Sequence, residues 1–252
     1  MKINQFFSLD CEPPPNHKKT PTNDGTFTLE SEQFTENCHS TAGAYEETLF
    51  NYVHGTELQH KIENSEINIF EVGFGLGIGP IATFNELKNY NGQINFYSSE
   101  LDENLVHWFK NAITEETNSI FPFSSLELVN EKEKPLRFVA KSSNRKLEIF
   151  IGDLIQNKNL IEKFLKNIHA IYQDPFSPKK NPTLWTTDWF KMLKNISHPK
   201  VVLSTYSASH SVHENLKEAG WHVLRAPGFA HKRSSTRATL TDGVFLGETK
   251  SP

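Results

Sequence analysis

The feature that most constrains the fold is a glycine-rich stretch, EVGFGLGIGP at residues 71–80. It follows a short apolar run that contains Ile67, Ile69 and Phe70, and it leads into the helix-like segment IATFNELKNY. A chain that leaves a buried strand and turns into a helix close to a ligand needs positions without a Cβ, which glycine supplies. The stretch therefore predicts a first strand, a tight ligand-binding turn and a first helix.

Glu71 indicates which ligand this turn accepts. Dinucleotide-binding turns usually read G-x-G-x-x-G and place a pyrophosphate at the helix N-terminus. Here the turn reads E-x-G-x-G-x-G, and a carboxylate at the strand end would repel phosphate but suits a cationic ligand. The pattern resembles motif I of the Rossmann-like S-adenosylmethionine-dependent methyltransferases. It predicts that Glu71, Gly73, Phe74, Gly75 and Gly77 bind this cofactor, with a glycine turn that holds no nucleotide as the alternative.

Length and composition limit the function classes. The 252 residues suffice for one large α/β domain with an N-terminal addition, but not for a second complete catalytic domain. A net charge of −4 makes no general case for nucleic-acid binding, so a polyanion would need a local basic face. Cys11 and Cys38 lack paired spacing, which argues against a zinc site. Without a signal peptide or a membrane-spanning apolar run, we expect a soluble, cytoplasmic protein that has no contact with membranes.

From residue 67 onward, strand-like and helix-like segments alternate, which predicts a parallel sheet covered by helices on both faces. We expect an α/β, Rossmann-like fold with a mostly parallel seven-stranded sheet in residues 61–252. Residues 1–60 are predicted to form an N-terminal extension, with a hairpin of 26–30 and 33–35 and a helix within 39–58. Further strands are expected at 94–100, 147–151, 170–174, 200–205 and 222–226. Helices are expected at 102–112, 155–167, 187–194 and 209–219. A connection is expected at 120–127, and a terminal hairpin is expected to pair 237–240 with 244–246.

Acidic residues end three of the expected strands, where doubly wound sheets bind their ligands. Glu100 stands at the distance beyond the glycine turn that suits a carboxylate accepting hydrogen bonds from both ribose hydroxyls. Asp153 follows the third strand, where methyltransferases often place an acid that accepts the adenine amine. Capping of the next helix is the alternative for both, with the cap shared between Glu100 and Asp102 in the first case. Asp174 opens PFSPKKNPTLWT, a loop with three prolines. Upstream, His39 and Ser40 either line the cofactor pocket or cap a helix.

Several segments together resemble one family, the methyltransferase domain of the tRNA 5-methylaminomethyl-2-thiouridine biosynthesis bifunctional proteins. The resemblance covers nearly the whole chain, and its most specific element is D-x-F-x-P-x-x-N-P-x-x-W. The segments are EVGFGLGIGP at 71–80, YSSELD at 97–102, IGD at 151–153, DPFSPKKNPTLWT at 174–186, STYSAS at 204–209, EAGWHV at 218–223 and GFAHKRSSTRATL at 228–240.

The resemblance implies an activity. In that family this domain uses S-adenosylmethionine to methylate the amine of 5-aminomethyluridine, often 2-thiolated, at the tRNA wobble position. An attached FAD oxidoreductase domain usually produces the amine. Because the sequence ends at Pro252, it resembles the stand-alone members that lack this domain. We therefore expect S-adenosylmethionine but neither FAD nor a metal, the tRNA anticodon region as partner, and a separate protein that generates the aminomethyl group.

The resemblance also implies residue roles. Asp174 would contact the cofactor, accept a hydrogen bond from the aminomethyl nitrogen and take up its proton. Phe176 would stack on the uracil, Asn181 would hold the loop, and Tyr206 would close the other side, with ordinary packing as the alternative for the two aromatic residues. A basic patch for anticodon phosphates would comprise Lys179, Lys180, Lys232 and Arg233, together with His231 and Arg237, with a solvated charge cluster as the alternative.

Two positions depart from the family pattern: Leu76 replaces a threonine of the glycine turn, and Pro175 replaces the glycine that commonly follows the catalytic aspartate. The alternatives within enzymes are a methyltransferase of a small amine or an aminopropyltransferase. The latter usually carries two acids in its loop, whereas here only Asp188 lies near Asp174. A non-catalytic tRNA-binding protein and an NAD-linked dehydrogenase are further alternatives. The combination of the acids at 71, 100, 153 and 174 disfavours the non-catalytic protein.

Overall fold

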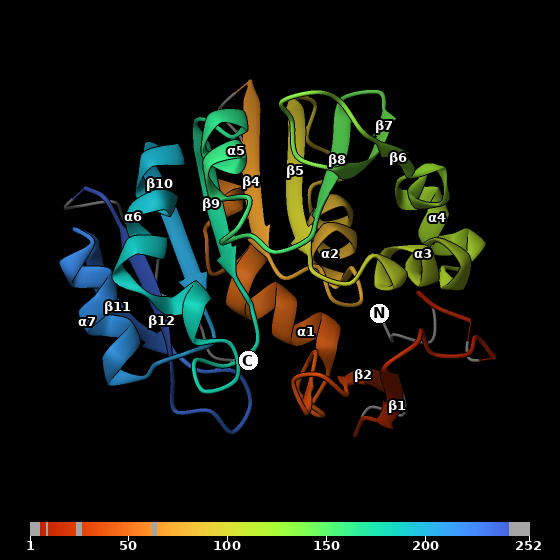
Figure 1. Cartoon of the computed structure of the whole chain (residues 1–252), viewed down its shortest axis with the longest axis horizontal. Helices are drawn as coiled ribbons and strands as arrows, with labels where there is room; N and C mark the ends of the chain where they lie inside the picture. Colours follow the sequence, from red (N-terminus) through yellow and green to blue (C-terminus); the bar gives the residue numbers. More distant parts are fainter. Residues whose placement is uncertain (1–5, 9, 24–26, 62–64, 242–252) are drawn as a thin grey trace.

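The computed structural model describes residues 6–8, 10–23, 27–61 and 65–241. Its main sheet has the strand order β11-β12-β10-β9-β4-β5-β8-β7-β6, and the edge-to-edge arrangement of the larger strands can be followed in Figure 1. The central strands are parallel: β10 (Ser197–Thr205), β9 (Ile168–Gln173), β4 (Glu66–Val72), β5 (Gln93–Glu100) and β8 (Arg145–Ile151). The strands at the two edges pair antiparallel: β11 (His222–Pro227), β12 (Ser234–Thr239), β7 (Arg137–Ser142) and β6 (Glu127–Val129).

The predicted α/β Rossmann-like class is confirmed, but the mostly parallel seven-stranded sheet is wrong, because the sheet has nine strands and is antiparallel at both edges. The missed strands β6 and β7 lie between the end of the connection expected at 120–127 and the strand expected at 147–151. β6 is largely exposed, so backbone pairing with β7 holds it and no apolar pattern marks it. The antiparallel partners of β12 are β10 and β11. The expected hairpin arm at 244–246 lies outside the described residues.

Alternation along β4 explains the helical layers. Ile67 and Ile69 face one core with α2 (Ile78–Glu86) and α3 (Glu103–Ala112), whereas Phe70 and Val72 face another. The second core is covered by α5 (Lys158–Phe164), α6 (Thr187–Ile196) and α7 (His210–Glu218). The short elements are α4 (Glu115–Ile120), η4 (Phe123–Ser125) and η5 (Pro182–Trp185). No helix in the described ranges is long and apolar enough to cross a membrane.

The N-terminal part forms a second, three-stranded sheet of β1 (His17–Pro21), β2 (Phe27–Ser31) and β3 (Glu36–Asn37). The expected hairpin arm at 33–35 is therefore a turn, and β3 begins one residue later. Phe27 and Leu29 join the same apolar core as Ile67, so this sheet packs on the main fold. Helix α1 (Ala44–Thr48) continues into the π-helix η2 (Leu49–Val53), followed by η3 (Leu58–Lys61).

Candidate active site

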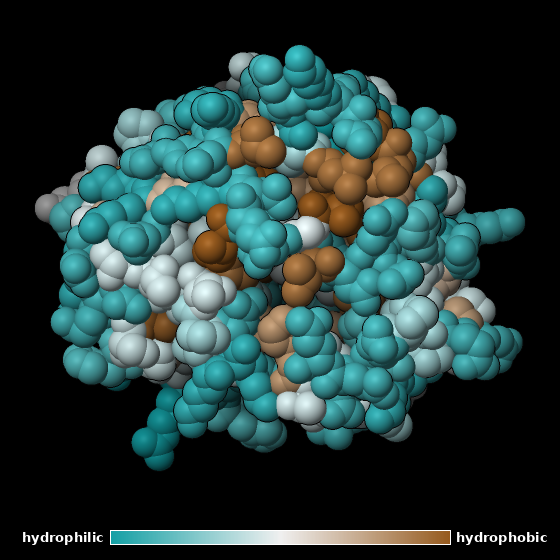
Figure 2. Space-filling view, viewed as in Figure 1, coloured by the Kyte–Doolittle hydropathy of each residue, from teal (hydrophilic) through white to brown (hydrophobic). Residues whose placement is uncertain are grey.

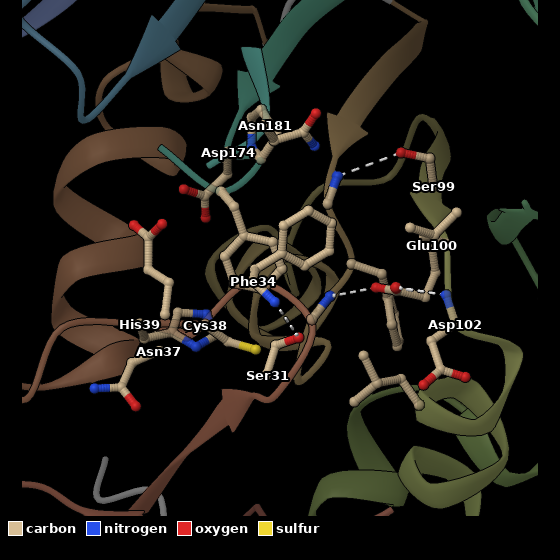
Figure 3. Close-up of a pocket in the computed structure, with 18 of the residues that line it drawn as sticks. Ser31, Phe34, Asn37, Cys38, His39, Ser99, Glu100, Asp102, Asp174 and Asn181 are labelled. Atoms are coloured by element: carbon tan, nitrogen blue, oxygen red, sulfur yellow. Dashed lines mark hydrogen bonds between the residues drawn. The ribbon is translucent and has the colours of Figure 1, made fainter. Parts of the chain in front are cut away.

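A cavity of about 1090 Å³ lies beyond the carboxyl ends of β4, β5, β8 and β9. The N-terminal residues from the end of β2 to α1 and the loop after β9 provide its other walls. In the space-filling view, apolar side chains surround a hollow near the middle of the visible face (Figure 2). Figure 3 shows Glu100 and Asp174 on opposite sides of the close-up, with Phe34 between them in this view. The cavity thus combines acidic and aromatic groups from distant parts of the chain.

The glycine turn brings the end of β4 against the backbone of the loop after β9. Gly73 has φ +99°, and a Cβ there would lie 2.7 Å from the carbonyl oxygen of Asp174. A Cβ on Gly79 would overlap the carboxylate of Glu71, so glycine at the start of α2 makes room for this side chain. Leu76, one of the departures from the family pattern, is fully buried in the core. Its apolar side chain fits that position.

Glu71 is 4% exposed and lines the cavity. Its Oε2 atom accepts a hydrogen bond of 2.5 Å from Ser98 Oγ. Burial raises the pKa of Glu71 well above its ordinary value, and the hydrogen bond from Ser98 partly offsets this effect. A cation in the cavity would lower that pKa again, so this residue can respond to a cationic ligand.

Glu100 connects the glycine turn to α3. Its Oε2 atom accepts a hydrogen bond of 3.0 Å from Gly75 N, and its Oε1 atom accepts one of 3.0 Å from Asp102 N. The N-cap of α3 is Asp102, and Glu100 binds the backbone N–H of this residue, so Glu100 supports the start of the helix as well as the glycine turn. Burial raises the pKa of Glu100 to about 7.

Asp153 also lines the cavity, after the end of β8. Its Oδ1 atom accepts hydrogen bonds from Ile155 N at 2.7 Å and from Gln156 N at 3.3 Å. It therefore stabilises the local turn while it faces the cavity. His39 and Ser40 line the same space. Because Gly43 is the N-cap of α1, their capping alternative is wrong.

Asp174 lines the cavity at the start of the loop after β9. Its backbone N–H donates to the carbonyl of Val72 at 3.1 Å, which places it beside the end of β4. Its Oδ1 atom accepts a hydrogen bond from the hydroxyl of Tyr52. Burial raises the pKa of Asp174 well above its ordinary value, although the Tyr52 hydrogen bond opposes the shift. A carboxyl with a raised pKa and a hydrogen-bond partner has the properties of a proton acceptor in catalysis.

The other loop residues named from the sequence also line the cavity. Phe176 stacks on Phe34, with ring centroids 4.4 Å apart and an interplanar angle of 24°. Asn181 precedes η5 and accepts a hydrogen bond of 3.0 Å from Thr183 Oγ1. The hydroxyl of Tyr206 donates to the carbonyl of Pro175 at 3.0 Å. Proline at 175, the second departure from the family pattern, is thus compatible with a fixed loop.

The proposed basic patch is only partly assembled. Lys232 lines the cavity, pairs with Glu47 at 2.9 Å and lies 4.8 Å from the ring centroid of Tyr206. Lys180 is exposed and donates to Thr35 Oγ1 at 2.5 Å. Lys179 and Arg233 are exposed as well. Arg237 is 3% exposed within β12, so its expected place on a phosphate-binding surface is wrong.

Sequence reasoning missed four residues of this site. Tyr52 and Glu47 come from the α1–η2 segment, for which the sequence predicts only a helix. Phe34 and Glu36 come from the turn and short strand after β2. Glu36 Oε2 accepts hydrogen bonds from Ser177 N at 3.2 Å and Ser177 Oγ at 2.9 Å. Nothing local in the sequence marks these residues, because their partners lie far along the chain.

The comparisons with known proteins agree with this geometry. The family model described as S-adenosyl-L-methionine-dependent methyltransferase matches residues 115–241, half of the chain. A tRNA 5-methylaminomethyl-2-thiouridine biosynthesis bifunctional protein MnmC from Leptospira interrogans is 26% identical and covers 87% of this chain. Its counterpart from Ralstonia nicotianae is 28% identical over 83% of this chain. The match spans only 35% and 32% of these relatives, about a third of their length.

A solved structure supports the same relationship. The crystal structure of MnmC2 from Aquifex aeolicus is 25% identical, with a TM-score of 0.71 over 93% of this chain and 72% of that chain. The resemblance to the methyltransferase part of the bifunctional proteins is thus confirmed. The residues present also fit the cofactor, because the glycine turn leaves space beside Glu71 and Glu100 faces the cavity. The chain therefore belongs to the family of S-adenosyl-L-methionine-dependent methyltransferases that its residues 115–241 match.

Proposed function

We propose that the protein methylates the aminomethyl nitrogen of 5-aminomethyluridine, with or without 2-thiolation, at the tRNA wobble position. The observation that carries this proposal is the place of Asp174, paired with Tyr52 and opposite Glu100 in a cavity with aromatic walls. The names of the bifunctional relatives support the choice of nucleoside. An amine acceptor and a sulfonium donor are both compatible with a cavity rich in carboxyl groups.

S-adenosylmethionine, when bound, supplies a methyl group on a positively charged sulfur that leaves as a neutral thioether. We assign Glu71, Gly73, Phe74, Gly75, Gly77, Glu100 and Asp153 to its binding, with Asp174 at the junction with the acceptor. Asp174 accepts a hydrogen bond from the acceptor nitrogen and so directs the nitrogen lone pair toward the methyl carbon. The new N–C bond forms as the S–C bond breaks, and the carboxylate takes up the proton that the nitrogen loses.

The acceptor base would lie among the aromatic side chains of the cavity. In this proposal Phe176 stacks on the uracil, Tyr206 borders the opposite side, and Asn181 holds the loop. The exposed side chains of Lys179, Lys180 and Arg233 would contact phosphates of the anticodon region. Lys232 contributes less to phosphate binding, since Glu47 already neutralises it.

The source of the acceptor amine is part of the proposal. The chain matches only about a third of its bifunctional relatives, within their methyltransferase part. We propose that another protein generates the aminomethyl group and that both act on tRNA in the cytoplasm.

The direct test is methylation of tRNA that carries 5-aminomethyluridine, followed by mass analysis of the nucleosides. Asp174→Asn should lower the rate about 100-fold or more, the usual range for loss of a general base. S-adenosylhomocysteine should still raise the melting temperature of this variant. The matched control is Asp188→Asn, which changes an exposed acid at the start of α6 and should keep the wild-type rate.

Other outcomes would contradict the proposal. Methylation of a small amine but not of tRNA would favour the small-amine alternative. Transfer from decarboxylated S-adenosylmethionine would indicate an aminopropyltransferase. Cofactor binding without any transfer would support a non-catalytic tRNA-binding protein.

A further inference from the structure

Tyr52 reaches the cavity from a π-helical turn, η2, in a segment that the sequence predicts only to be helical. Isolated π-helical turns occur frequently at functional sites. The ring is 3% exposed, and its hydroxyl donates a hydrogen bond to Oδ1 of Asp174, 122 residues further along the chain. Tyr52 is also among the residues that line the cavity. The hydroxyl thus lies where it can act on the carboxyl group assigned to proton transfer.

The surroundings hold the Tyr52 side chain in one place. Its carbonyl accepts two hydrogen bonds from Thr56, at 2.9 Å from the backbone N–H and at 2.7 Å from Oγ1. The neighbouring carbonyl of Asn51 accepts a hydrogen bond from Ser204 Oγ on β10. The ring packs against Tyr172 of β9, with centroids 5.4 Å apart. Because both the backbone and the ring are fixed, the hydroxyl is preorganised for Asp174.

The groups around Asp174 leave few that stabilise its carboxylate form other than the Tyr52 hydroxyl. Within the described part of the chain, Tyr52 is the only side chain with a recorded hydrogen bond to the Asp174 carboxyl group. Lys232, the nearby cation, already pairs with Glu47. The ionised carboxylates of Glu36 and Glu47 favour the neutral form of Asp174. Ionised Cys38, Glu71 or Tyr206 would add further negative charge near it. The titratable groups that act on Asp174 or respond to it are Glu36, Cys38, Glu47, Glu71, Tyr206 and Lys232.

We propose that Tyr52 is a positioning residue for Asp174, one that holds Oδ1, stabilises the carboxylate form and leaves Oδ2 for the acceptor amine. This inference rests on the proposed function, because it needs Asp174 to be the proton acceptor. Neighbouring carboxyl groups and burial both disfavour the carboxylate, and the phenol hydrogen bond counteracts them. Removal of one oxygen atom, in Tyr52→Phe, separates this role from the packing of the ring.

The test measures methylation of tRNA bearing 5-aminomethyluridine as a function of pH for the wild type and Tyr52→Phe. Without the phenol, Asp174 gains its negative charge only at higher pH, so the acid limb of the profile should move up by about one pH unit. At a pH on that limb the rate should fall about tenfold. The KM for S-adenosylmethionine should not change, and S-adenosylhomocysteine should still raise the melting temperature.

Tyr45→Phe is the matched control. Tyr45 is a buried tyrosine of α1 whose hydroxyl accepts a hydrogen bond from Asn85 at 2.9 Å, outside the cavity lining. Its profile should superimpose on that of the wild type. An unshifted profile for Tyr52→Phe, whether its rate is unchanged or uniformly lowered, overturns the inference. Absence of wild-type methylation would instead overturn the proposed function.

Discussion

Gly73 and Gly152 each follow a parallel strand with nearly the same backbone angle, φ +99° and φ +101°. They differ in their surroundings. A Cβ at Gly73 would press on the backbone carbonyl of Asp174 at 2.7 Å, whereas at Gly152 the nearest recorded atom is Asn157 Nδ2 at 3.5 Å. Alanine variants at the two positions share the cost of a left-handed backbone, but only the variant at Gly73 should displace Asp174. Their comparison therefore distinguishes the two effects.

We expect Gly73→Ala and Gly152→Ala to share a conformational destabilisation of about 1–3 kcal/mol. Gly73→Ala should in addition lower the methylation rate at least about tenfold relative to Gly152→Ala, because small displacements of reacting groups are costly. Thermal unfolding and steady-state rates measure the two effects. Equal rates in the two variants would show that Asp174 tolerates the displacement.

At the scale of elements, the turn between β2 and β3 is joined to the loop after β9. Glu36 accepts two hydrogen bonds from Ser177, Thr35 accepts one from Lys180, and Phe34 stacks on Phe176. The N-terminal sheet therefore forms part of the cavity wall and stabilises the loop after β9.

Glu36→Ala should release this turn from the loop. For the proposed tRNA substrate we expect the KM to rise several-fold, because the loop after β9 loses two hydrogen bonds of about 1 kcal/mol each or more. Binding of S-adenosylhomocysteine, measured by calorimetry, should remain at the wild-type affinity. Lys18→Ala is the control, since it breaks only the exposed Lys18–Glu32 pair of the same sheet. An unchanged KM in Glu36→Ala would mean that the turn does not support the loop.

The elements that could be predicted are those with a local signal. The glycine turn, the acid at the end of β5 and the proline-rich loop each follow from a short run of residues, and the structure places them around one cavity. Strand β6 was missed because it is largely exposed and backbone pairing defines it, whereas β7 carries a short alternating signal in Phe138 and Ala140 that the sequence reasoning did not use. Tyr52 and the Glu47–Lys232 pair were missed because their partners lie 122 and 185 residues away. No local pattern encodes such distant contacts.

For the whole molecule, the cavity makes stability depend on pH. Burial raises the pKa of Glu100 to about 7 and raises the pKa values of Glu71 and Asp174 well above their ordinary range. The folded protein thus keeps protons that the unfolded chain releases at about pH 4 to 4.5. The contribution of these three carboxyl groups to the free energy of unfolding should therefore be largest below that pH and fall as pH rises through 7.

Glu100→Gln tests this dependence. The variant should lose less stability than the wild type between pH 4.5 and 7, by an amount on the order of 2 kcal/mol. Denaturant unfolding at a series of pH values gives the difference. Parallel pH dependences for the two proteins would show that Glu100 does not hold a proton in the folded state.

The link between Glu36 and Ser177, which spans 141 residues, also determines when the cavity can be completed. During synthesis the N-terminal sheet emerges first, but its partner loop follows only after β9. Contacts between such distant segments form late, because a long chain must first be brought together. A nascent chain that extends through β5 can pair its first parallel strands, yet it lacks the cavity wall formed by the loop after β9. Completion of the catalytic cavity is therefore expected to be a late step of folding.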